Sequence, residues 1–137
     1  MLARVAAVTA AALDLLIVLF QIALIAGAPW GQLTQGGYAE GALPVAGRAI
    51  AAVSVLVVSA FALGQLGRVG WGPLGGRRRL ATGLTWAALI YSIIGIVVNL
   101  ASPSALERAV WAPVCLILAV CAALVLSGNQ RRRPNTK

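Results

Sequence analysis

Asp14 is the one acidic residue that falls near the middle of a long apolar stretch. A charge in mid-bilayer costs at least about 2.5–3.5 kcal/mol on insertion scales, so such a residue is expected to face a partner or a cavity. Gln21 follows seven residues later, about 20° off the same helical face. The two therefore predict an inward polar stripe. Two roles stay open for Asp14: it could hold helices together through hydrogen bonds, or carry a proton or cation.

A second group of polar and aromatic residues falls at one end of the apolar stretches, and these are the candidate ligand-binding residues: Gln21, Arg48, Asn99, Glu107, Arg108 and Trp111. Their shared depth predicts a binding site in the outer third of a bundle. We expect Arg48 to pair with Glu107, since an unpaired charge at the edge of hydrocarbon is costly. A local alternative stays open, in which Glu107 caps its own helix and the arginines reach separately into the headgroups.

Local spacing defines the start of the last apolar stretch. Ser104 and Glu107 have the spacing of a capping box, and Pro103 sets a turn before them. Pro113, deeper in the stretch, is expected to kink the helix or free a carbonyl for a partner. A helix is therefore predicted to begin directly after Ser104.

Another stretch carries small and hydroxylated residues along one helical face, at steps of three and four. Thr85, Ala88, Ser92 and Gly95 make up this face, and Asn99 continues it. Small residues let membrane helices approach closely, and hydroxyl groups bond across the interface. We expect helix packing from Thr85 to Gly95, whereas Asn99 lies beside the proposed site.

The elements that must position these residues are four apolar spans. The chain has 137 residues, of which 61% are hydrophobic and 10% are charged, against roughly 25% charged in a soluble domain. The predicted spans cover residues 5–27, 45–66, 80–101 and 105–126. Each is close to the roughly 20 residues that cross a bilayer. The sequence predicts an all-α bundle of four transmembrane helices in one domain, residues 1–128, with a basic tail, residues 129–137.

The first span could instead be a cleaved signal peptide, because residues 26–28 resemble a cleavage site. Its apolar stretch is too long, however, Asp14 interrupts it, and Pro29 directly after the cut would hinder the peptidase. We expect the span to be retained.

Basic residues set the expected orientation, because cytoplasmic loops of membrane proteins carry an excess of Lys and Arg. Nine basic residues lie at the two chain ends and in the connection between spans two and three, whereas only Arg48 and Arg108 fall at the other face. Both termini are therefore predicted to be cytoplasmic. The net charge of +8 is clustered beside apolar runs, which indicates membrane orientation rather than nucleic-acid binding.

The sequence predicts neither a metal site nor a cofactor. It contains no His, and its acidic residues are scattered. Cys115 and Cys121 are six residues apart in one helix, about 9 Å of rise, which is too far for a disulfide. We interpret them as small apolar residues.

Two segments resemble small four-helix integral membrane proteins of high-GC, actinobacterial-type bacteria. They are marked by Pro29, Trp30, Gly31, Gly36, Gly37, Leu43, Pro44 and Arg48, and by Asn99, Ser102, Ser104, Glu107, Arg108, Trp111 and Pro113. The resemblance implies the fold and the bacterial plasma membrane, but no activity. Small multidrug transporters also have four short helices and an acid in the first, but their motifs around that acid are absent here.

These observations favour a non-enzymatic protein that binds an amphiphile, or the transmembrane helices of a partner, near the outer leaflet. A second hypothesis is a small transporter with Asp14 as the proton or cation carrier. It would need a homo-oligomer, because four short helices enclose little pathway. A third is an intramembrane enzyme that acts on a lipid or isoprenoid, with Asp14 or Glu107 as the acid.

Overall fold

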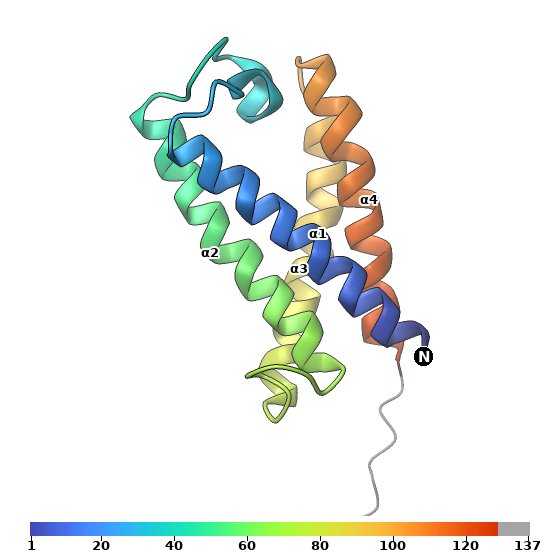
Figure 1. Ribbon diagram of the computed structural model, residues 1–137. Helices are drawn as coiled ribbons and strands as arrows, with labels where there is room; N and C mark the ends of the chain where they lie inside the picture. The colour runs from blue at the N-terminus through green and yellow to red at the C-terminus, as the bar shows by residue number, and fades with distance from the viewer. Residues whose placement is uncertain (129–137) are drawn as a thin grey trace, which may run out of the picture.

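The computed structural model describes residues 1–128, which form four long α-helices and no strand (Figure 1). In chain order the helices are α1 (Leu2–Ile25), α2 (Val45–Arg68), α3 (Arg78–Leu100) and α4 (Ala105–Ser127). The predicted all-α class with four spanning helices is confirmed. The predicted basic tail, residues 129–137, lies outside the described residues.

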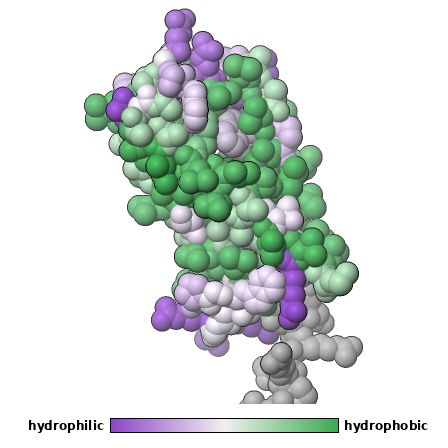
Figure 2. Space-filling view, in the orientation of Figure 1, coloured by the Kyte–Doolittle hydropathy of each residue, from purple (hydrophilic) through white to green (hydrophobic). Residues whose placement is uncertain are grey.

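Each helix is long and apolar enough to cross a membrane. Their 23 or 24 residues correspond to about 35 Å at 1.5 Å per residue, against about 30 Å of hydrocarbon. Only 17% to 33% of their most apolar segments is buried within the chain. Most apolar side chains therefore point outward, and Figure 2 shows them as a belt between two hydrophilic ends. The chain is thus a small multi-pass membrane protein.

The four helices form a ring in which α1 and α3 each pack against both α2 and α4. Two ends of the bundle can be distinguished. The basic end holds Met1, the 69–77 connection and the end of α4, whereas the capped end holds the 26–44 and 101–104 connections (Figure 1). The α1–α2 pair crosses the α3–α4 pair obliquely, and the pairs separate toward the capped end.

Small residues set the close packing near the basic end. Ala6, Ala7 and Ala10 of α1 belong to one buried cluster with Cys121 of α4 and with Val69, directly after α2. Alanine lets the helix axes approach closely because it has so little side chain. This cluster brings the end of α2 beside the first third of α1.

Close packing also joins α2 to α3 in the same half of the bundle. A Cβ atom on Gly64 would lie 2.5 Å from the Cβ of Leu84, so only glycine fits there. Thr85, Ala88 and Ser92 are buried, as their predicted packing role requires. The tight contact near the basic end and the separation toward the capped end leave an internal space between the helices.

The 26–44 connection folds over the capped end through two short 3₁₀ turns, η1 (Gly31–Leu33) and η2 (Gln35–Gly37). Gln35 has a φ of 54°, in the left-handed region that non-glycine residues rarely adopt. Its side-chain amide donates to the carbonyl of Gly47, 2.9 Å away, which ties the turn to α2. The connection is therefore an ordered cover over the bundle.

Candidate functional site

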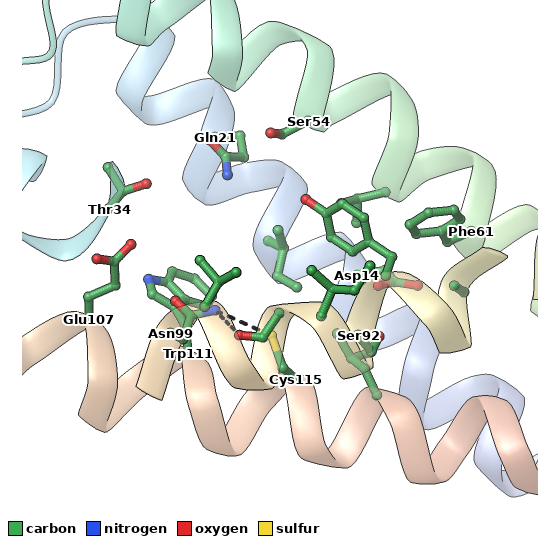
Figure 3. Close-up of a pocket in the computed structure, with 18 of the residues that line it drawn as sticks. Asp14, Gln21, Thr34, Ser54, Phe61, Ser92, Asn99, Glu107, Trp111 and Cys115 are labelled. Atoms are coloured by element: carbon green, nitrogen blue, oxygen red, sulfur yellow. Dashed lines mark hydrogen bonds between the residues drawn. The ribbon is translucent and has the colours of Figure 1, made fainter. Parts of the chain in front are cut away.

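A cavity of about 330 Å³ lies between the four helices and extends to the underside of the cover. This is within the roughly 300–1,000 Å³ of small-molecule sites. Figure 3 shows Asp14 at one end of the cavity and Glu107, Asn99 and Trp111 at the other, with Gln21 between them. Its polar lining is Asp14, Gln21, Thr34, Gln35, Ser54, Gln65, Ser92, Asn99 and Glu107.

Asp14 and Gln65 form the deep end of the cavity. Asp14 is 3% exposed and Gln65 is 1% exposed, so both are shielded by the helices around them. The side-chain amide of Gln65 donates to a carboxylate oxygen of Asp14 at 3.3 Å. The other polar atom of this amide, Oε1, is buried without a hydrogen-bond partner among residues 1–128. A hydrogen-bond donor on a ligand in the cavity can therefore bond to Oε1 of Gln65, which accepts nothing from the described residues.

Gln21 continues the polar stripe of α1 toward the capped end, as predicted from its spacing. Its Oε1 is also buried, and it has no hydrogen-bond partner in the described part of the chain. Unsatisfied buried acceptors are uncommon in native proteins, and each one requires an explanation. Two of them on one cavity indicate that the cavity can receive hydrogen-bond donors.

Glu107 anchors the cover to α4. Its side chain is 8% exposed, and one carboxylate oxygen accepts the backbone N–H of Gly36 at 2.9 Å and the hydroxyl of Ser102. The Ser104 hydroxyl accepts the backbone N–H of Glu107 at 3.2 Å, which is the predicted cap. Instead of bonding back to Ser104, as a full capping box would, the carboxylate bonds to the cover.

Two further predicted residues line the capped end. The Asn99 amide donates to the carbonyl of Gly95 at 2.7 Å and to Cys115 Sγ at 3.7 Å. The indole N–H of Trp111 donates to the carbonyl of Leu33, so this ring also holds the cover. The predicted residues Gln21, Asn99, Glu107 and Trp111, together with Asp14, therefore share one cavity.

The two predicted arginines lie elsewhere. Arg48 donates through Nε to the carbonyl of Leu43 at 2.8 Å, and Arg108 donates to the carbonyl of Ser102. Neither arginine lines the cavity. The predicted ion pair between Arg48 and Glu107 is wrong: among residues 1–128 the two side chains bond only to other groups. The carboxylate already accepts nearby N–H and O–H donors, whereas the long arginine bonds to a carbonyl at the end of the cover.

Gln65 is the site residue that the sequence analysis missed. It stands only three residues before the end of α2, so its position in the sequence suggests the membrane edge. The signal that could have found it is a second glutamine inside an apolar span. What places it beside Asp14 is the helix register, since Val69 packs among the first alanines of α1.

The arrangement offers hydrogen bonding and charge rather than metal ligation. Within residues 1–128 no group of three or more His, Cys, Asp or Glu side chains lies close enough to hold a metal ion. Comparison of the chain with models of protein families, with curated proteins and with solved structures finds no match to it.

Proposed function

We propose that this protein binds an amphiphilic small molecule in the cavity between its helices, at the outer leaflet of a bacterial plasma membrane. The observation that carries the proposal is the cavity itself, which joins apolar walls to polar groups at both ends. An amphiphile is the class of ligand whose two parts match such a lining.

The route of entry supports a ligand from the bilayer. The cavity is lined in part by Ile50 of α2 and by Ile94 and Val98 of α3, which are 56–62% exposed on the bundle surface. These side chains face lipid when the helices span a membrane. The cover closes the adjacent end, where Glu107 and Trp111 hold it. A ligand with an apolar chain would thus enter sideways between α2 and α3.

The charge distribution supports the outer leaflet. Arg4, Arg68 and residues 77–79 lie at the basic end, which the positive-inside rule assigns to the cytoplasm. The capped end, with the cover and the adjacent end of the cavity, then faces outward.

Binding is favoured over catalysis because the polar groups at the capped end already bond to the protein itself. Glu107 accepts from Gly36 and Ser102, and Asn99 donates to Gly95 and Cys115. Groups committed in this way hold structure and shape a pocket.

Transport is the second candidate, favoured by one observation: Asp14 lies midway along α1 and lines the cavity. A carrier would move the same ligand to the inner leaflet, so it requires the binding step as well.

Fluorescence of Trp111 tests the proposal, because this ring lines the cavity. A variant in which Phe replaces Trp30, Trp71 and Trp86 is placed in phosphatidylcholine nanodiscs and titrated with brominated dodecanol and brominated dodecylamine. We expect saturable quenching, and we expect Ser54→Phe, which fills the cavity, to abolish the saturable part. Val53→Phe is the matched control on the lipid side of α2, where residue 53 is 60% exposed.

A second single-tryptophan variant gives the baseline. Trp86 is 52% exposed on the bundle surface, so a variant that keeps only Trp86 should be quenched in linear proportion to the probe in the bilayer. If Trp111 behaves as Trp86 does with both probes, and Ser54→Phe changes nothing, the binding proposal is wrong. For the transport candidate, probe trapped inside proteoliposomes should leave faster than from protein-free vesicles.

A further inference from the structure

We infer that the headgroup of this amphiphile is an ammonium group with N–H donors, held at the deep end of the cavity by Asp14 and Gln65. The inference rests on the proposed function and adds the chemical class of the ligand.

The first observation that supports an ammonium group is the presence of buried hydrogen-bond acceptors without donors. The side chain of Gln65 is only 1% exposed. Its Oε1 has no hydrogen-bond partner among the described residues, and the same is true of Oε1 of Gln21. A buried acceptor without a donor has lost its hydration and gained no hydrogen bond in return, which is unfavourable. An ammonium group carries several N–H donors, so it can serve Oε1 of Gln65 and the carboxylate of Asp14 together. A hydroxyl carries a single donor and serves only one of them.

The second observation is the charge of the residues that line the cavity. The cavity is lined by two carboxylates, Asp14 and Glu107, and by no lysine or arginine among the described residues. The nearest arginines to the capped end, Arg48 and Arg108, are bonded to backbone carbonyls outside the cavity. A buried charge is stable only when it is paired. An anionic headgroup would find no such partner here, whereas a cationic one would.

The carboxylates of Asp14 and Glu107 differ in the hydrogen bonds that they already accept from the protein. Glu107 accepts from Gly36 and Ser102 and holds the cover. Within residues 1–128 Asp14 has one hydrogen-bond partner, Gln65, at a long 3.3 Å. Asp14 is therefore the carboxylate that receives the ligand, and Glu107 closes the site.

Aromatic rings complete the deep end. Phe61 and Tyr91 line the cavity, with ring centroids 5.4 Å apart, and Figure 3 shows Phe61 toward the same end of the cavity as Asp14. Ring faces attract cations at close range, most strongly where water is excluded. The headgroup would sit between acceptors and rings, and its chain would leave between α2 and α3.

The test compares headgroups on one chain length. The single-Trp111 protein in phosphatidylcholine nanodiscs is titrated at neutral pH with brominated dodecylamine, dodecanol and dodecyl phosphate. We expect the half-saturating concentration of the amine to be lower than that of the alcohol by roughly tenfold or more. Equal binding of amine and alcohol, or preferred binding of the phosphate, would overturn the inference and leave amphiphile binding intact. Saturation by none of the three would instead sink the proposed function.

Substitutions at Asp14 and Gln65 test whether these residues cause the preference for the amine. Asp14→Asn should weaken binding of the amine far more than binding of the alcohol, and so remove the advantage of the amine. Glu40→Gln is the matched control in the cover, away from the lining. Gln65→Met keeps the side-chain length and removes the unpartnered oxygen, so it should also weaken amine binding. An amine advantage that survives both Asp14→Asn and Gln65→Met contradicts the assignment. The wild-type comparison of headgroups stands even if a variant fails to fold.

Two sources could supply an ammonium headgroup, and a further arm separates them. Phosphatidylethanolamine carries a primary ammonium next to a phosphate, whereas a free amphiphilic amine carries the ammonium alone. If phosphatidylethanolamine in the nanodisc competes with brominated dodecylamine, the ligand is a lipid. If only added dodecylamine competes, it is a free amphiphile.

Discussion

At the scale of single residues, Glu107 shows how a charged side chain can serve as a latch inside a membrane protein. Its carboxylate bonds to Gly36 in the cover and to Ser102 before α4. A carboxylate that accepts backbone N–H groups forms charge-assisted bonds, which are roughly twice as strong as neutral ones. The cover is thus fastened to α4 directly above the cavity.

We expect Glu107→Ala to lower the free energy of unfolding by about 1–3 kcal/mol, because it leaves the half-buried N–H of Gly36 and the buried hydroxyl of Ser102 without an acceptor. Glu107→Gln should cost less, since an amide oxygen can still accept. Hydrogen exchange of the 30–41 segment is the specific measurement, and exchange at Gly36 should accelerate most. Glu40→Gln serves as the control for loss of charge. Unchanged exchange at Gly36 in Glu107→Ala would show that the latch does not hold the cover.

At the scale of the helices, the cavity exists because packing is tight at one end and open at the other. Gly64 lets α2 touch α3 near the basic end, and the alanines of α1 do the same against α4. Toward the capped end the helices separate, and larger side chains such as Trp111 line the space between them.

Gly64→Ala tests this account of the packing. The added methyl group would lie 2.5 Å from the Cβ of Leu84, closer than real contacts allow, and overpacking of this kind costs about 1–3 kcal/mol. Gly83→Ala is the matched control, because a Cβ at Gly83 meets nothing within 4 Å. Thermal unfolding in nanodiscs should show a lower midpoint for Gly64→Ala and an unchanged or higher one for Gly83→Ala. Equal midpoints would mean that α2 and α3 do not depend on this contact.

At the scale of the whole molecule, the fold can be predicted from the lengths of the apolar spans and from the spacing of polar residues within them. Apolar spans of membrane-crossing length predict the helices, and helical spacing places Asp14 and Gln21 on one inward face. The shared depth of Asn99, Glu107 and Trp111 correctly groups them at one end of the cavity.

Two features of the site depend on geometry that spacing does not encode. Gln65 reaches Asp14 because α2 ends beside the first third of α1, and this register comes from packing between distant residues. Arg48 lies near the start of α2 at the capped end, but its long side chain bonds to the Leu43 carbonyl rather than to Glu107. Depth can be estimated along one helix, whereas the partner of a flexible side chain depends on all its neighbours.

Photolabelling tests the central claim, that an amphiphile occupies this cavity, most directly. Dodecylamine and dodecanol that carry a diazirine on the chain are activated in nanodiscs, and the labelled residues are mapped by mass spectrometry. We expect saturable labelling of cavity residues such as Ile17, Val58 and Trp111, lost when unlabelled probe is added in excess. Labelling confined to lipid-facing residues such as Leu19 and Leu56, rising in proportion to the probe and unaffected by competition, would contradict the claim.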